Sequence, residues 1–591
     1  MRYRKDINGL RSLAVLPVLF FHAGWEVFSG GFLGVDVFFT ISGYLIASLI
    51  FQGLDEGSFS ILGFYDKRAR RIIPALLAVI ILSTVTSMFF MLPYDLKNYG
   101  QSVVATVLSA NNILLYITSG YWSLAAEFKP LYHTWSLGVE EQYYLIIPML
   151  ITILFRVSTN KAKAYFFCLS FLLIGSFFIS YFSDDKEWNF LIIFSRMWEL
   201  ILGSLVALYL RYRDVRSNSI VSFFGLFLIV FSYVYPNMFF TNQALVNLVP
   251  VIGVCLIILF SSNESLAGRF LSFTPLFFIG TISYSVYLFH MPLLAMLRLA
   301  TNGNPSVIAQ LFFVILSIPL AYLTWRYIEI PFKDKNIFSN RRFYSSISIT
   351  SCLLLAFGVI LHKSYGLQDL FPEYSYGNNP QAYADKPYRL QRETFPLDAN
   401  KENLLVIGNS FARDFINMMD EFGSLDNYDA VYITDVNNVE LFTSLLDQAD
   451  VVVSVSSAGM ASRLNPDEVK VESNKMYNFL SKNFNGEFYR VGTKNFGWNN
   501  NFVRRMNYED YINFRVRPND TSISANLIEK EIWGENYVDI ISLLSNESGA
   551  VRLFTPQGKF ISFDTEHITR SGAEYLGSIV FENTSLKNLI K

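Results

Sequence analysis

The sequence predicts a polytopic membrane bundle of α-helices followed by a C-terminal α/β domain. Of the 591 residues, 52% are hydrophobic and only 16% are charged, whereas soluble globular chains carry about 25% charged residues. The apolar residues are concentrated in long runs before about residue 362, and polar and charged residues become frequent after it. A formal net charge of −2 and the lack of a long basic tract argue against nucleic acid as a partner.

Eleven hydrophobic segments are long enough, or nearly so, to cross a bilayer, which takes about 20 helical residues. They run over 10–24, 32–52, 72–92, 142–155, 164–182, 192–210, 219–235, 243–261, 276–299, 306–325 and 345–362. A weaker segment, 102–118, contains Asn111 and Asn112, and we expect it to be interfacial or re-entrant. The expected architecture is therefore a ten-span core plus an eleventh span that links it to the C-terminal domain.

The expected domains are a transmembrane domain over 1–335, a linking helix over 336–362, a linker or packed extension over 363–400 and an α/β domain over 401–591. With the N-terminus in the cytoplasm and 102–118 not spanning, 19 Lys and Arg residues fall in inner loops and three in outer loops. The positive-inside rule therefore predicts a cytoplasmic N-terminus and a C-terminal domain outside the cytoplasm. The start MRYRKD resembles a signal peptide, but no cleavage site follows, so we expect an uncleaved first span.

The first span, LRSLAVLPVLFFHAGW, carries two ionisable residues, Arg11 and His22. Eleven residues of helix place them on nearly the same face, about 16 Å apart along the axis. Charged groups at membrane depth cost about 2.5–3.5 kcal/mol each, so they usually face a bundle interior and serve a function. The alternative is that Arg11 extends to the headgroups and His22 lies in interfacial water.

The loop after the second span, FYDKRARRIIP, gathers Arg68, Arg70 and Arg71 at the cytoplasmic face. These charges are explained by topology alone, because positive loops stay inside. They are equally suited to an anionic cytosolic ligand, since guanidinium groups bind phosphate in a bidentate manner.

Other polar residues lie within or beside the spans. Arg196 and Glu199 are three residues apart on one helical face, and an ion pair would lower the cost of burying both. The remaining candidates are Asp36, Ser283, Tyr284, Ser285 and His290 in spans, and His133, Glu140 and Glu141 in the outer loop HTWSLGVEEQYYL. Together they indicate a polar path through a bundle, which fits a transporter as well as an enzyme.

The ordered motifs of residues 3–335 resemble acyltransferase family 3. They are Arg11-x10-His22, GVDVFFTISGYLI, KRARRIIP, HTWSLGVEEQYYL, SRMWELILG, SYSVYLFHMP and WRYIEIP. The resemblance implies a ten-span bundle that passes an acyl group, usually acetyl, from cytoplasmic acyl-coenzyme A to an extracytoplasmic glycan. It implies that Arg11 and His22 are the essential pair and that the cytoplasmic arginines face coenzyme A, which is a substrate. We expect no metal.

After residue 401, strand and helix patterns alternate, which indicates a parallel sheet. LLVIG, VYITD and VVVSVSS read as buried strands, and SFARDFINMMDEF and ITRSGAEYLGSIVFEN read as helices. Ser410 lies at the first strand-to-helix turn, where the helix dipole favours a developing oxyanion. Asp564 precedes His567 by three residues, a spacing that suits a Ser-His-Asp arrangement. The alternative for Ser410 is a structural helix cap.

These two segments resemble the first and last blocks of the SGNH-hydrolase family, a three-layer α/β fold. The resemblance implies that Ser410 is the nucleophile and that Asp564 and His567 complete the triad. The chain reads GNS where the family more often has GDS. It also lacks the family's Gly-x-Asn-Asp block and offers Ser456, Ser457 and Gly459 after the third strand.

The expected function is therefore glycan O-acylation at a bacterial cytoplasmic (inner) membrane. The expected donor is acetyl-CoA, and the expected acceptor is a cell-surface glycan or lipid-linked oligosaccharide, with lipopolysaccharide O-antigen ahead of peptidoglycan. Membrane lipids surround the bundle. Two rival functions are a transporter or flippase, which leaves the serine triad without a role, and a membrane-anchored esterase, which needs no elaborate bundle.

Overall fold

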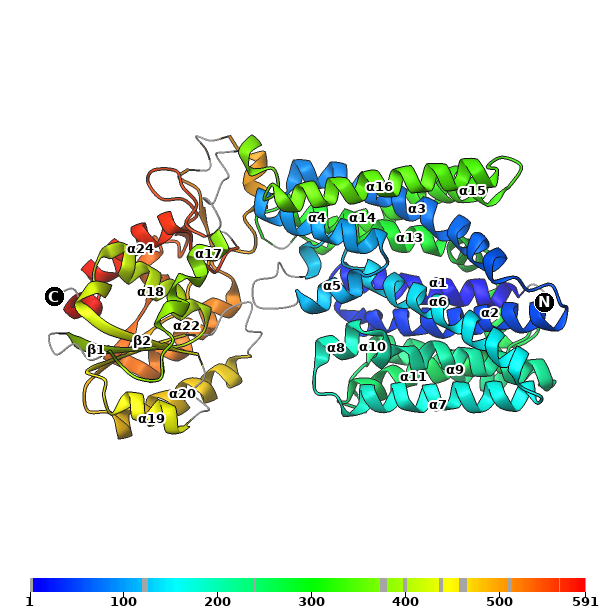
Figure 1. The fold of residues 1–591 in the computed structure, drawn as a ribbon, viewed down its shortest axis with the longest axis horizontal. Coiled ribbons are helices and arrows are strands. Elements are labelled where there is room, and N and C mark those ends of the chain that lie inside the picture. The colour runs from blue at the N-terminus through cyan, green and yellow to red at the C-terminus, as the bar shows by residue number, and fades with distance from the viewer. Residues whose placement is uncertain are drawn as a thin grey trace. The chain divides into compact units, whose positions relative to one another are not determined.

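The computed structural model describes residues 4–118, 126–238, 240–303, 305–371, 380–396, 401–434, 439–456, 465–507, 510, 512–562 and 564–589. The chain forms two compact units. The helical unit comprises Met1–Phe89, Leu96–Arg298 and Pro305–Gly366, and the α/β unit comprises Phe90–Asp95, Leu299–Asn304 and Leu367–Lys591. Figure 1 shows the long helices of the first unit and the twisted sheet of the second.

The helical unit is built from α1 to α16. Their bounds are α1 Lys5–His22, α2 Gly34–Asp55, α3 Ile61–Phe90, α4 Pro93–Val107, α5 Asn111–Ile117, α6 Thr134–Val157, α7 Lys161–Phe182, α8 Lys186–Leu191, α9 Ile193–Tyr212, α10 Ser219–Val234, α11 Gln243–Phe260, α12 Leu266–Leu271, α13 Thr274–Leu299, α14 Val307–Thr324, α15 Ile330–Lys333 and α16 Asn340–Lys363. A π-helical turn, Trp325–Glu329, joins α14 to α15.

Nine helices within the described ranges are long and apolar enough to cross a membrane, and α10 is a shorter apolar helix. The chain is therefore a multi-pass membrane protein, as predicted. The sequence analysis counted eleven spans, and the difference is α1 together with the short α10. Although α1 is 18 residues long, it contains Lys5, Asp6 and Arg11, which lower its hydropathy.

The segment 102–118 forms no helix of spanning length. It contains the end of α4, which has 15 residues, and the whole of α5, which has seven. The helices are interrupted at Ser109, whose φ of 54° is unusual for a residue with a side chain. The buried Asn111 amide donates to the Leu131 carbonyl at 2.9 Å, so this polar break is bonded inside the unit.

Two motifs that the sequence analysis placed in loops lie in helices, so those assignments were wrong. FYDKRARRIIP is part of α3, and all but the first residue of HTWSLGVEEQYYL belongs to α6. Both helices begin about eight to eleven residues before the apolar runs that mark them in the sequence. Arg68, Arg71 and Glu140 of these helices line an interior pocket, and a hydropathy pattern ends at such charges although the helix does not.

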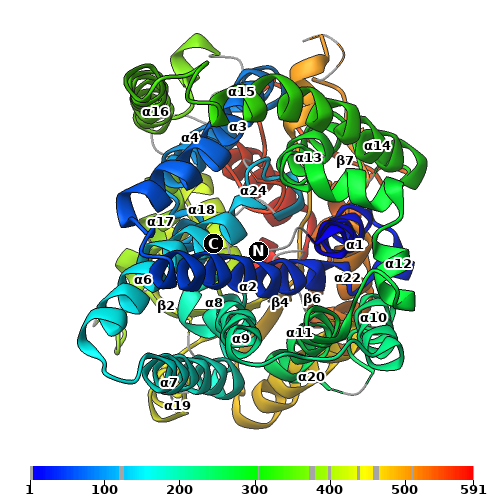
Figure 2. The same ribbon diagram turned by 90° about the vertical axis from the view of Figure 1, so that its right-hand side faces the viewer.

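Helices α2 and α9 pack tightly because small residues let their backbones approach. A Cβ atom added at Gly43 would lie 1.8 Å from the Leu200 carbonyl oxygen, and one added at Gly203 would lie 2.0 Å from that of Thr40. Small residues commonly allow such close contact between membrane helices. Figure 2 looks along the bundle and shows α2 near its middle, with α6, α9 and α11 around it.

The α/β unit contains a five-stranded parallel sheet of order β2-β1-β3-β4-β6. The strands are β1 Glu402–Ile407, β2 Tyr428–Ile433, β3 Val451–Val455, β4 Glu487–Val491 and β6 Tyr537–Val538; β5 Arg515–Val516 and β7 Val551–Arg552 form a separate antiparallel pair. The expected parallel sheet is confirmed, because each buried apolar run became a strand.

Helices cover both faces of this sheet, which gives three layers (Figure 1). Helices α18 (Ser410–Phe422) and α24 (Arg570–Asn583) pack together on one face, where Phe415 contacts Phe581. Helices α19 (Val439–Leu446), α20 (Pro466–Asn483) and α22 (Asp520–Trp533) contribute to the apolar core on the other. The short helix α23 (Ile540–Leu544) follows β6.

Part of the segment expected to be a linker or packed extension lies against α18. It contains α17 (Pro380–Asp385) and a 3₁₀ turn, Lys386–Leu390. Asp385 accepts a hydrogen bond from the buried Arg413 of α18, and Arg389 pairs with Asp420 at 2.9 Å. This stretch is thus fixed to the helix that begins at Ser410.

Candidate functional site

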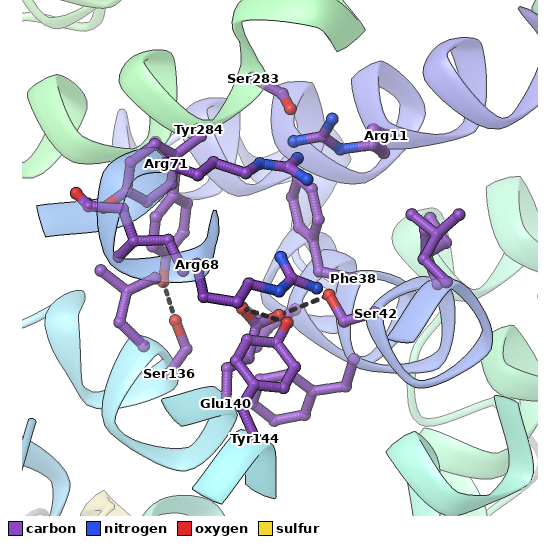
Figure 3. A pocket seen from close by; sticks show the side chains of 17 residues that line it. Arg11, Phe38, Ser42, Arg68, Arg71, Ser136, Glu140, Tyr144, Ser283 and Tyr284 are labelled. Atoms are coloured by element: carbon purple, nitrogen blue, oxygen red, sulfur yellow. Dashed lines mark hydrogen bonds between the residues drawn. The ribbon is translucent and has the colours of Figure 1, made fainter. Parts of the chain in front are cut away.

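The helical unit contains a pocket between α1, α2, α3, α6 and α13, lined by both polar and apolar side chains. Its charged and polar lining residues are Arg11, Ser42, Arg68, Arg71, Ser136, Glu140, Tyr144, Ser283, Tyr284 and Tyr287. Figure 3 shows the guanidinium groups of Arg11, Arg68 and Arg71 directed into the same space. We call this pocket the arginine cavity. It brings together six of the residues selected from the sequence.

Within the described part of the chain, the three arginines of this cavity share it with one carboxyl group, that of Glu140. No ion pair or hydrogen bond engages their side chains there, although the guanidinium of Arg68 lies 4.6 Å from the centroid of the Tyr144 ring. Three guanidinium groups converge beside this single carboxyl group, so the cavity has an excess of positive charge that attracts an anion, and guanidinium groups suit phosphate or carboxylate.

Arg70 has a different environment. It is buried, and its guanidinium donates to Asp66 at 3.1 Å, to the Phe332 and Phe338 carbonyls at 3.0 and 2.9 Å, and to Asn340 at 2.9 Å. Residues 68 and 71 are three apart on α3 and share a face, whereas residue 70 points away from it. Arg70 therefore ties α3 to the start of α16 and does not reach the cavity.

One wall of the cavity is a hydrogen-bonded polar network. Glu140 accepts from Ser42 at 2.8 Å and from Tyr144 at 3.2 Å (Figure 3). Ser136 and Tyr287 share a hydrogen bond of 2.7 Å on α6 and α13. Tyr284 donates to the Ile72 carbonyl at 2.9 Å, and Ser283 lines the same wall. The buried hydroxyls are thus fixed in position before any ligand binds.

A second polar cluster joins α2 and α9 outside this cavity. Arg196 lies 3.3 Å from Glu199, the ion pair that the sequence predicts, and 3.4 Å from Asp36. All three side chains are at most 2% exposed. A guanidinium between two carboxylates reduces the cost of burying each of them, so this cluster is explained by packing.

Three histidines from separate helices meet near the far end of α1. His22 ends α1, His133 immediately precedes α6 and His290 lies within α13. The ring centroids of His22 and His133 are each 5.2 Å from that of His290. Tyr287 joins this cluster to the arginine cavity, since its hydroxyl donates to the His133 carbonyl at 2.9 Å.

The α/β unit contains an assembled Ser-His-Asp arrangement. His567 Nε2 lies 2.9 Å from Ser410 Oγ, and His567 Nδ1 lies 2.6 Å from Asp564 Oδ2. His567 is fully buried, and Ser410 is 6% exposed. The geometry suits a base that removes the serine proton while the carboxylate orients the imidazole.

The turn between β1 and α18 places Ser410. Gly408 has a φ of 148°, and a Cβ atom there would lie 3.0 Å from the Val455 carbonyl oxygen. Asn409 is the N-cap of α18, since its side chain accepts from the Phe411 amide at 3.0 Å. Ser410 is therefore not the capping residue, and its hydroxyl is directed to His567 instead.

The loop Asp564–His567 is held in a strained turn. Thr565 has a φ of 82°, a conformation that is costly for a β-branched residue. The Phe496 amide donates to its carbonyl at 2.7 Å, and the amides of Glu566 and His567 donate to the Asp564 carboxylate. Burial raises the pKa of Asp564, but the His567 ring and these donors together hold that pKa below its ordinary value. Asp564 is thus an anion at neutral pH.

The described residues of the α/β unit contain no complete counterpart of the Gly-x-Asn-Asp block of the SGNH-hydrolase family. Ser456 is buried after β3, and its amide donates to the Val491 carbonyl at 2.8 Å as part of the sheet. It is therefore not free to bind an oxyanion. Ser457 and Gly459 lie outside the described residues.

The sequence pattern of the family described as an acyltransferase domain matches residues 4–326, more than half of the chain. The chain belongs to this acyltransferase family. The match contains every helix that lines the arginine cavity and the histidine cluster. Both sites are therefore features of the acyltransferase domain.

This acyltransferase is similar to two curated O-acetyltransferases. It is 29% identical over 351 residues to "O-acetyltransferase OatA" of Staphylococcus aureus, with 56% of this chain and 58% of the relative covered. It is 27% identical over 366 residues to "Peptidoglycan O-acetyltransferase OatA" of Listeria monocytogenes, covering 57% and 59%. The chain thus spans less than two thirds of the length of these relatives. No solved structure matches the chain.

Several polar residues of the acyltransferase domain were not singled out from the sequence. Ser42, Ser136, Tyr144 and Tyr287 lie within the quoted motifs, yet hydroxyl groups are common enough in spans to carry no signal alone. Arg298 was overlooked near the end of α13 and is only 5% exposed. An arginine in an otherwise apolar helix is a usable signal.

Proposed function

We propose that this acyltransferase transfers an acetyl group from acetyl-CoA at the cytoplasmic face of a bacterial inner membrane to a hydroxyl of a cell-envelope glycan. The observation that carries the proposal is the arginine cavity, where Arg11, Arg68 and Arg71 converge and make no ion pair within the described residues. Coenzyme A carries phosphates, which such a set binds. Arg68 and Arg71 lie in the first half of α3, which the positive-inside pattern places toward the cytoplasm.

The C-terminal unit supplies an acyl-transfer site on the other side of the membrane. Its assembled triad supports an SGNH-like assignment with Ser410 as nucleophile. Ser410 Oγ attacks the carbonyl of the acyl group delivered by the membrane domain while His567 takes the hydroxyl proton. The bond between the acyl group and its carrier breaks, the departing carrier takes that proton from His567, and an acyl-serine ester remains. A glycan hydroxyl then loses its proton to His567 and takes the acyl group, and Ser410 regains a proton. Arg11 and His22 act on the acyl donor before this step.

The acceptor favoured by the comparisons is peptidoglycan, because the matched Listeria relative is named a peptidoglycan O-acetyltransferase. The O-antigen acceptor that the sequence analysis put first has no support of this kind. A transporter would have no use for the bond between Ser410 and His567. An esterase anchor would not need a cavity with three arginines.

The test is mass spectrometry of envelope glycans from cells with and without the gene. We expect a mass difference of one acetyl group on muropeptides, removable by mild base, only when the gene is present. The same extracts report lipopolysaccharide sugars. Acetylation confined to those sugars would move the acceptor to O-antigen, and unchanged acetylation of both glycans would contradict the proposal.

Arg71 and Arg70 provide a matched pair of tests for the cavity. A hydrogen bond to a charged group contributes about 1.5–3 kcal/mol, so Arg71→Ala should weaken equilibrium binding of acetyl-CoA by about ten- to a hundredfold. Arg70→Ala should instead lower the yield of folded protein, because Asp66 loses a buried partner. The folded fraction of that variant should bind acetyl-CoA normally. An equal loss of affinity for acetyl-CoA in both variants would refute the claim that Arg71 binds the donor whereas Arg70 is only structural.

A further inference from the structure

His290 lies against His22 with a hydrogen-bond pattern that defines its ring. His290 Nδ1 is 2.5 Å from the carbonyl oxygen of Tyr287, one turn earlier in α13. A carbonyl oxygen only accepts, so Nδ1 of His290 carries the proton. In a neutral imidazole the other nitrogen then has a free lone pair. His290 is fully buried, so this arrangement is shielded from water.

The position of the proton on the His22 ring follows from its contact with His290. His290 Nε2 lies 3.3 Å from His22 Nδ1, and as an acceptor it requires that His22 donate. This contact favours the His22 tautomer in which Nδ1 holds the proton and Nε2 has the free lone pair. That nitrogen is the one available to a substrate, and the His22 side chain is only half-buried.

The backbone at His22 is fixed as well. The Arg298 guanidinium donates to the His22 carbonyl, and it also donates to Gln310 Oε1 at 2.6 Å and to the Glu127 carbonyl at 3.3 Å. A buried arginine from α13 thus joins the end of α1 to α14. With the backbone held by Arg298, a contact from His290 is sufficient to determine the orientation of the ring.

We propose that His290 is a positioning residue that holds the His22 imidazole with Nε2 presented to the acyl donor. The inference rests on the proposed function, in which His22 acts on that donor. It adds a residue that touches neither the arginine cavity nor the substrate. The same logic operates where a carboxylate orients a catalytic histidine, with the buried, carbonyl-bonded imidazole of His290 in place of the carboxylate.

The test compares His290→Leu with His290→Gln in the full-length protein, reconstituted in lipid nanodiscs with radiolabelled acetyl-CoA. The leucine side chain fills the space but accepts no hydrogen bond, whereas the glutamine carbonyl oxygen can accept from His22 Nδ1. His362→Leu is the matched control, since that histidine also lies in the last turn of a long helix, α16, and is distant in sequence from both sites. The readouts are kcat for coenzyme A release and KM for acetyl-CoA.

His290→Leu should lower kcat by about ten- to a hundredfold, less than loss of a general base, while KM stays within about twofold. His290→Gln should recover most of this loss, and His362→Leu should match the wild type. Wild-type kcat in His290→Leu, a change confined to KM, or no recovery by glutamine would overturn the inference.

A third variant, His22→Ala, distinguishes a failure of the proposed function from a failure of the role proposed for His290. Full activity in that variant refutes the proposed role of His22 itself, whereas an inactive His22→Ala with a fully active His290→Leu refutes only the role of His290.

Discussion

Replacing Ser410 by alanine should leave the envelope glycan without its acetyl group. The Ser410 hydroxyl is 2.9 Å from His567, which is itself 2.6 Å from Asp564, and no other group in this set can carry the acyl ester. Loss of the nucleophile from a triad costs about 10⁴–10⁶ in rate, because its members act as a unit. Mass spectrometry of muropeptides should therefore show no acetyl group above the level of cells that lack the gene.

The control for this variant is Asn409→Asp. The aspartate keeps an oxygen for the Phe411 amide, so the N-cap of α18 and the fold are preserved. We expect normal acetylation in Asn409→Asp and normal binding of acetyl-CoA in Ser410→Ala. Full acetylation in Ser410→Ala would show that Ser410 is only the first residue of a helix and that the bundle transfers the group alone.

Replacing His22 by alanine should also abolish glycan acetylation, because His22 acts in the acyltransferase domain. His22 does not line the arginine cavity, so the variant should still bind acetyl-CoA. Loss of a general base costs about 10²–10⁴ in rate. Coenzyme A release from purified protein should therefore fall to the background, whereas the amount of protein in the membrane should not change.

His362→Ala is the control for the loss of a histidine at a helix end, and we expect it to be active. Near-normal acetylation in His22→Ala would return that residue to the alternative in which it lies in interfacial water. Loss of acetyl-CoA binding in the same variant would mean that His22 supports the cavity and does not act on the acyl group.

The triad was predictable from the sequence because its parts are local. The strand-to-helix turn at Ser410 and the three-residue spacing from Asp564 to His567 are both visible in short segments, and the strand LLVIG became β1. Buried strands of a parallel sheet are continuous apolar runs, which a sequence shows directly. Ser410 and His567 are 157 positions apart and meet through a hydrogen bond, and only the requirement for a base beside the serine suggested it.

The histidine cluster was not predictable in the same way. His22, His133 and His290 come from three helices, and no local pattern shows that their rings meet. Helix ends were misplaced for a related reason, because Arg68, Glu140 and their neighbours interrupt the apolar runs while they face the cavity. The different environments of Arg70 and of Arg68 and Arg71 were missed for the same reason. These residues lie in α3, whereas the apolar run places the start of that helix eleven residues too late, at residue 72.

The central claim is that an acetyl group from cytoplasmic acetyl-CoA reaches Ser410, and sided membrane vesicles test it most directly. Radiolabelled acetyl-CoA is added to inside-out vesicles, which expose the cytoplasmic face, and to right-side-out vesicles. The reaction is stopped with acid, and the peptide that contains Ser410 is isolated. We predict acid-stable, base-labile label on Ser410 in inside-out vesicles only, and none in His22→Ala. Labelled glycan without labelled Ser410, or labelling from the outer face, would contradict the account.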